Sequence, residues 1–112
     1  MKPIQLIAFI FTLSLFSINV IAQNNQLDKA ISHADEAFKA RDSKELAVYA
    51  EIAQPFALAA QKEMHFSHEG RNHIEAGIVS LGQAVEKGKL GATDSARPAA
   101  GEALRHFKEA KE

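Results

Sequence analysis

The spacing of apolar residues, at intervals of three and four, constrains the fold of this chain more than any other feature. Leu27, Ala30, Ile31, Ala34 and Phe38 form one face of a helix predicted over about 26–41. Alanine, glutamate, lysine and leucine dominate the sequence beyond residue 22, and no run of alternating β-branched or aromatic residues interrupts them. The sequence therefore predicts an all-α protein.

A second helix is predicted from Asp42 to about Phe66. Asp42 and Glu45 have the spacing of a capping box, in which the first carboxylate accepts a backbone hydrogen bond and the second reaches back. Pro55 lies inside this segment and predicts a kink rather than a break. Gly70 is expected to end the helix in the left-handed conformation.

A third helix is predicted to begin at Asn72, which repeats the capping arrangement with Glu75. Gly77 and Gly82 lie within it, and each weakens a helix by about 1 kcal/mol relative to alanine. That cost is reasonable if a neighbouring helix approaches closely on this side. Both glycines are therefore predicted to face a close helix–helix contact.

The fourth helix is predicted to begin between Thr93 and Ser95. A cap at Ser95 would place Pro98 in the first turn, where its missing backbone donor costs nothing. Four helices joined by short loops imply antiparallel neighbours. The predicted architecture is an up-down-up-down four-helix bundle.

Residues 1–22 differ from the rest and have the features of a secretory signal peptide. Lys2 gives a positive start, residues 4–18 are almost continuously apolar, and small or branched residues occupy 20–22. The alternative is an uncleaved membrane anchor, which needs about twenty apolar residues, and polar residues thin this run toward its end. We expect a signal peptide at 1–22 and a periplasmic four-helix bundle domain at 23–112, with no stable membrane anchor after cleavage.

Charge and cysteine content exclude several classes of protein. Thirteen basic and fourteen acidic residues give a net charge of -1 and are interspersed, so no basic stripe for nucleic acid is present. The chain has no cysteine, which excludes a lipoprotein anchor and disulfides. Small metal ions and periplasmic proteins remain open as partners.

The sequence offers little support for an enzyme. It has no cysteine nucleophile, Gly-x-Ser-x-Gly motif, phosphate-binding glycine loop or His-Glu-x-x-His helix. A haem bundle is conceivable with His106 as an axial ligand, yet Met64 is near the end of the second predicted helix and no other axial ligand is evident. We therefore expect a protein without catalytic activity.

The five histidines are the candidate metal ligands, because imidazole is the side chain most often used to bind transition metals. In an up-down-up-down bundle, the end of the second helix and the start of the third lie at the same end as the close of the fourth. Histidines from all four helices should therefore gather in one half of the bundle. The predicted ligands are His33, His65, His68, His73 and His106.

His65 and His68 are predicted to form the nucleus of the site. They are three residues apart and project from one side of a helix if the second helix extends that far. Glu63 and Glu69 could add oxygen ligands. Such a pair suits copper, nickel or zinc, although a histidine near a helix end is also often a solvated or capping residue.

The same spacing of alanine and histidine occurs in the first and the last predicted helices. Ala30-x-x-His33-x-x-x-Ala37 has the same spacing as Ala103-x-x-His106-x-x-x-Ala110. This shared spacing is either a sequence repeat or a coincidence in an alanine-rich chain. For His33 and His106, partly buried packing is an alternative to metal binding.

Three segments, LDKAISHADEAFKA, NHIEAGIVSLGQAVEKG and EALRHFKEA, resemble the exported small metal-binding protein family. The resemblance covers nearly all of residues 23–112, with an insertion around 62–69. It implies a helical bundle that takes up divalent transition metals outside the cytoplasm, copper(II) foremost and nickel or zinc after it, without performing a reaction.

The chain departs from the family pattern at many positions. His33, His73 and His106 match family histidines, whereas His65 and His68 fall in the insertion. Other residues stand where the resemblance leads us to expect histidine, at Ala40, Ile52, Ala59, Ala76, Ser80, Lys87 and Ala99. The alternative function is therefore a helical-bundle interaction module that has lost metal binding.

Overall fold

The computed structural model describes residues 26–112 and confirms the predicted all-α four-helix bundle. The predicted signal peptide lies outside the described residues. Within them, no helix is long and apolar enough to cross a membrane. The helices are α2 (Gln26–Phe38), α3 (Ser43–Gln61), α4 (His68–Lys89) and α5 (Thr93–Ala110).

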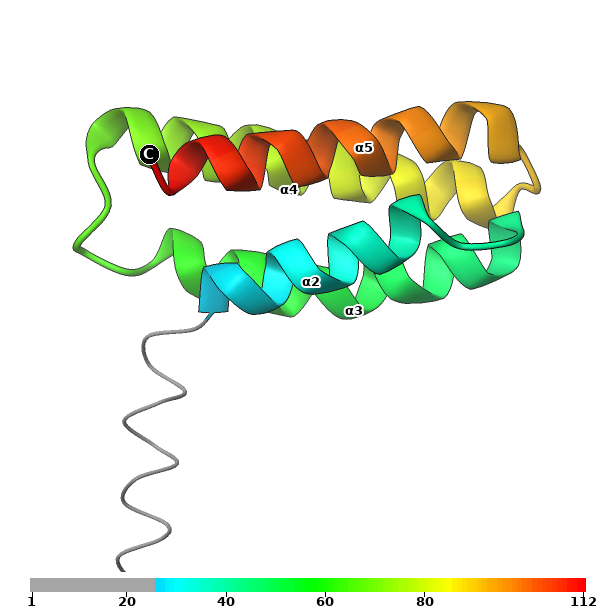
Figure 1. The fold of residues 1–112 in the computed structure, drawn as a ribbon, viewed down its shortest axis with the longest axis horizontal. Helices are drawn as coiled ribbons and strands as arrows, with labels where there is room; N and C mark the ends of the chain where they lie inside the picture. The colour runs from blue at the N-terminus through cyan, green and yellow to red at the C-terminus, as the bar shows by residue number, and fades with distance from the viewer. Residues whose placement is uncertain (1–25) are drawn as a thin grey trace, which may run out of the picture.

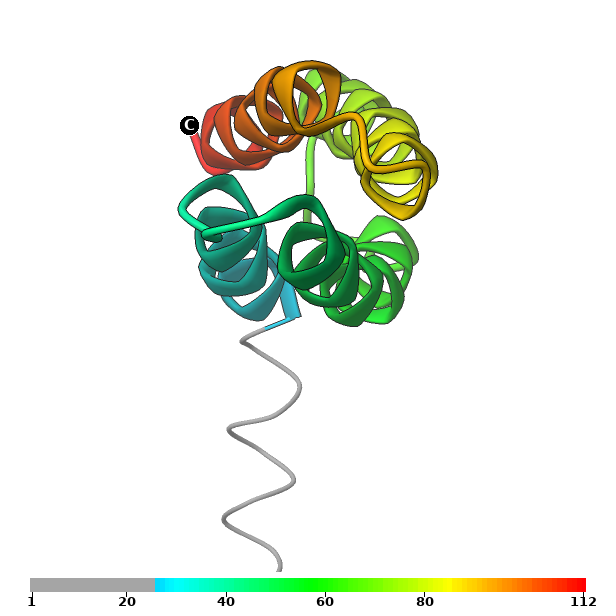
Figure 2. The same ribbon diagram turned by 90° about the vertical axis from the view of Figure 1, so that its right-hand side faces the viewer.

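The helices run up, down, up and down, and each packs against its neighbour in the sequence (Figure 1). Seen along the bundle, α5 closes the ring by packing against α2 (Figure 2). The α3–α4 connection therefore lies at the same end as the first turn of α2 and the last turn of α5. This end carries most of the histidines.

Alanine forms most of the core. Of the 21 buried hydrophobic residues within 26–112, 15 are alanine, and the largest fully buried side chains in this part of the chain are Phe107, Leu46, Ile74 and Leu81. Because a methyl group occupies little space between two helices, facing backbones approach closely where alanine and glycine meet. Contacts between helices are consequently set by backbone positions as much as by large side chains.

The start of α3 agrees with the sequence prediction, as does the absence of a break at Pro55, whereas the predicted kink stays a prediction. The Asp42 carboxylate accepts a hydrogen bond from the Glu45 backbone N–H at 2.8 Å, and Glu45 accepts one from the Arg41 N–H at 3.3 Å. The helix continues through Pro55 without a break. Both carboxylates thus satisfy backbone donors that the first turn leaves without helical partners.

The boundary between α3 and α4 was predicted wrongly. The helix α3 ends at Gln61, and α4 begins at His68 after Ser67, whose hydroxyl accepts a hydrogen bond from the Gly70 N–H at 3.0 Å. Gly70 is therefore in the first turn of α4, and Asn72 lies inside the helix. A serine cap five residues earlier satisfies the first turn, so the Asn72 cap is not used.

The start of α5 also differs from its predicted cap. The helix begins at Thr93, and Ala92 precedes it without a side-chain cap. Pro98 is then the sixth helical residue, in the second turn rather than the first. The chain enters this helix from Gly91, which has a φ of 79° and ends α4 in the left-handed conformation that glycine adopts without strain.

The two glycines of α4 for which a close helix–helix contact was predicted behave differently. A Cβ placed on Gly77 would lie 2.4 Å from a ring atom of Phe107, which confirms the predicted close approach of a neighbouring helix. A Cβ on Gly82 would meet nothing within 4 Å, so the prediction was wrong there. Periodicity alone gives Gly82 no core position, whereas Gly77 falls on the buried stripe with Ile74 and Leu81.

Candidate metal centre

One face of α4 brings its backbone close to α5. Gly70, His73 and Gly77 are spaced at three and four residues, so they share this face. A Cβ on Gly70 would lie 3.2 Å from the Ala110 carbonyl oxygen, and one on Gly77 would overlap the Phe107 ring. His73 therefore projects from a narrow helix–helix contact between two glycines.

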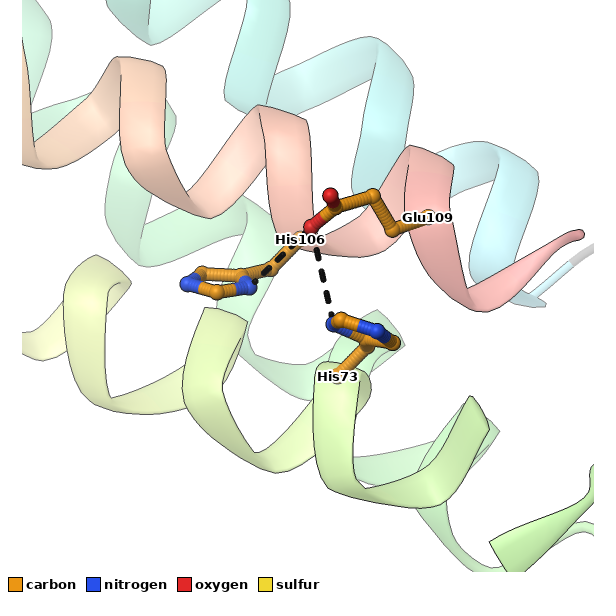
Figure 3. Close-up of side chains that lie close together, drawn as sticks. All are labelled: His73, His106 and Glu109. Carbon is orange, nitrogen blue, oxygen red and sulfur yellow. Dashed lines mark ion pairs between the residues drawn. The ribbon is translucent and has the colours of Figure 1, made fainter. Parts of the chain in front are cut away.

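The last turns of α5 supply two side chains to the same place. His106 and Glu109 are three residues apart, which puts them on one side of the helix. Figure 3 shows both side chains beside His73 of α4. The imidazole rings of His73 and His106 have centroids 5.8 Å apart, and ligand atoms of all three residues lie within 4.8 Å of one another.

The Glu109 carboxylate lies against both imidazoles. Its Oε1 is 3.5 Å from His73 Nδ1 and 3.5 Å from His106 Nδ1. The buried Nδ1 of His106 makes no hydrogen bond, because the contact with Glu109 lacks hydrogen-bond geometry. A buried ring nitrogen without a hydrogen-bond partner needs an explanation, and a ligand is one.

These distances fit a transition metal ion. In a tetrahedral site with bonds of about 2.0–2.1 Å, ligand atoms lie about 3.4 Å from one another. Both nitrogen–oxygen distances, at 3.5 Å, are close to this value. Two imidazoles and one carboxylate also form a donor set that copper, nickel and zinc accept.

The three side chains are partly accessible. His106 is 21% exposed, His73 30% and Glu109 36%. A cavity of about 320 Å³ adjoins His73 and Glu109 and is also lined by Ser67 and Glu69. The group therefore has room for a further small ligand on a bound ion, which three protein donors leave open.

His33 lies outside this group. Its Nδ1 is 2.7 Å from Glu36 Oε1 on the same helix, and its ring stacks on Phe56 of α3 with centroids 5.5 Å apart. Partly buried packing, the alternative that the sequence left open, describes this contact. The assignment of His33 as a metal ligand stays a prediction.

His65 and His68 do not form the predicted helical pair. The helix α3 ends at Gln61, so His65 lies in the α3–α4 loop and His68 is the first residue of α4. His65 Nε2 is 3.0 Å from Glu63 Oε1, and its ring contacts Phe66. Within residues 26–112, neither histidine belongs to a group of three donors, and their role as ligands stays a prediction.

Glu109 was not among the ligands predicted from the sequence. Glu63 and Glu69 were considered instead because they flank the histidines of the inserted segment. The spacing His106-x-x-Glu109 could have identified Glu109 as a candidate ligand, since a helical residue and its neighbour three positions later lie side by side.

Helical bundles can build a metal centre from imidazole and carboxylate side chains on facing helices, and the group of His73, His106 and Glu109 has this composition. A family model described as small metal-binding protein matches residues 1–110. The chain therefore belongs to the small metal-binding protein family, and metal ions are its partners. A comparison with curated proteins gives no match.

Proposed function

We propose that this protein binds one divalent transition metal ion through His73, His106 and Glu109, for sequestration or transport outside the cytoplasm. The observation that carries this proposal is the convergence of the three donors from α4 and α5, with the His106 Nδ1 buried and not hydrogen-bonded. Family membership supports metal binding in general. The apolar residues 4–18 support export.

Copper(II) is the ion that we expect to bind most tightly, followed by nickel(II) or zinc(II). Imidazole suits all three ions, and a given nitrogen and oxygen donor set generally binds copper(II) most strongly among the divalent first-row metals. A catalytic role is not proposed, because a metal cargo needs only reversible binding. The partly exposed donors support such reversibility.

The proposal is tested by isothermal titration of tag-free residues 23–112 with copper(II), nickel(II) and zinc(II) at pH 7.5. We expect a single high-affinity equivalent of copper(II), lost in His106→Ala and kept in His33→Ala. The His33 variant is a matched control because its histidine is also followed by glutamate three residues later. At pH 5 the apparent affinity should be much lower than at pH 7.5, since protons compete with the ion for the imidazole nitrogens.

The outcomes separate the proposal from its alternatives. Equal loss in the two alanine variants would place the ion elsewhere or distribute it over several histidines. No binding of any of the three ions would remove the proposed function and favour the interaction module. An affinity at pH 5 equal to that at pH 7.5 would exclude histidine as the main donor.

A further inference from the structure

The carboxylate oxygen at the centre of the site is shared with an arginine. Arg105 lies one turn before Glu109 on α5, and its Nη1 donates a hydrogen bond to Glu109 Oε1 at 3.2 Å. The same oxygen faces His73 and His106. If the three donors held a metal ion, both the ion and the Arg105 guanidinium would therefore contact the same oxygen atom, Glu109 Oε1.

We infer that Arg105 is a built-in competitor that lowers the affinity of the site for divalent metal ions. This inference rests on the proposed function. With a metal–oxygen bond of about 2 Å, the guanidinium nitrogen at 3.2 Å from the same oxygen lies within about 5 Å of the ion. Two cations at this separation repel each other, and the hydrogen bond reduces the electron density on the oxygen that the ion would bind.

The expected size of the effect follows from the exposure of the pair. At about 5 Å in water, repulsion between a single and a double charge corresponds to roughly tenfold in affinity, and salt reduces it. Arg105 is more than half exposed, so its hydrogen bond to Glu109 adds less than about twofold. Removal of the charge should therefore tighten metal binding about threefold to tenfold at low salt.

Arg105 could instead hold Glu109 in place for the ion. This positioning role predicts that removal of the arginine weakens metal binding, the opposite of what competition predicts. The geometry favours competition, because Arg105 approaches the oxygen that faces the two imidazoles. A positioning residue would be expected to bind the other carboxylate oxygen and leave this one free. Competition also predicts easier release of the ion, which suits a carrier.

The test compares copper(II) affinity in wild-type residues 23–112 and three variants, at low and at moderate salt. Arg105→Gln should bind about threefold to tenfold more tightly, with a smaller gain at moderate salt. Arg105→Lys keeps the positive charge and should stay within about twofold of wild type. Arg41→Gln is the matched control, because Arg41 also pairs with a glutamate four residues later, at the opposite end of the bundle.

The results distinguish this inference from the proposed function. Wild-type protein that takes up no copper(II) overturns both. Wild-type binding with equal or weaker affinity in Arg105→Gln overturns the inference alone, as does a gain of the same size in Arg41→Gln. Thermal unfolding without metal must show Arg105→Gln to be folded like wild type, and Arg105→Met, which also removes the charge, replaces it if it is not.

Discussion

Two segments with one sequence pattern have different surroundings in this bundle. Residues 30–37 of α2 and 103–110 of α5 both read alanine-x-x-histidine-x-x-glutamate-alanine. In α5 the histidine faces His73, with ring centroids 5.8 Å apart, and in α2 it faces Phe56 at 5.5 Å. The residue on the neighbouring helix therefore decides whether the pattern becomes part of a three-donor group.

The two patterns also differ within their own helices. In α2 His33 Nδ1 and Glu36 Oε1 are 2.7 Å apart, so the two side chains bind each other and form what we call a closed pair. In α5 the corresponding distance is 3.5 Å, and the His106 Nδ1 makes no hydrogen bond. A histidine and a glutamate three residues apart satisfy each other when no third donor is near, and such a closed pair is a poor starting point for a metal site.

The largest expected effect comes from making the α5 pattern resemble the α2 pattern. His73→Phe would place a phenyl ring opposite His106, as Phe56 lies opposite His33. Loss of one of two imidazole donors should weaken copper(II) binding by at least about 100-fold. Titration calorimetry measures this loss, and an unchanged affinity would mean that His106 and Glu109 need no partner on α4.

A smaller effect is expected from widening the contact between α4 and α5. Gly77→Ala forces the Phe107 ring to move, and such overpacking costs about 1–3 kcal/mol, of which better helix propensity recovers up to about 1 kcal/mol. Urea unfolding should show a net loss of up to about 2 kcal/mol. Copper(II) affinity should fall as well, because the helices that carry His73 and His106 move apart.

Gly82→Ala is the matched control for this variant. A Cβ at Gly82 meets no atom within 4 Å, so only the gain in helix propensity, up to about 1 kcal/mol, remains. The two alanine variants should therefore shift the free energy of unfolding in opposite directions. A stabilised Gly77→Ala protein would show that Phe107 adjusts freely and that the glycine does not set the helix separation.

The smallest expected effect is a gained site in α2 and α3. Phe56→His places an imidazole opposite His33 and Glu36, at a ring separation close to that of the α4–α5 pair. We expect a second equivalent of copper(II), at least about tenfold weaker than the first, because the ion must open the contact between His33 and Glu36 and because Lys29 lies 5.5 Å from the Phe56 ring and repels an ion there. Phe56→Ala should add no equivalent, and a stoichiometry that stays at one in Phe56→His would contradict the comparison.

The fold follows from the sequence because its signals are local. Residues spaced at three and four predict each helix, and Asp42 with Glu45 marks the start of α3. The start of α4 was less predictable, since Ser67 and Asn72 both offer a capping side chain before a helical stretch. Only the packed structure decides between them, where Gly70 must lie in the helix to approach Ala110.

The candidate site could be predicted only in part, because it depends on which residues face each other across two helices. His73 and His106 stood among the predicted ligands, and the antiparallel arrangement correctly brings α4 and the end of α5 together. The sequence gives no rotation of either helix about its axis. That rotation brings Glu109 next to His73 and turns His33 toward Phe56.

The alanine core has a consequence for how this protein can change over time. Alanine has no side-chain rotamers to freeze, so ordering the interior costs little side-chain conformational entropy. Residues at the edges of the helices can then be exchanged without rearranging an interlocked interior, in contrast to cores built from large branched side chains. A chain of this kind can gain or lose imidazoles along its helices and keep its architecture.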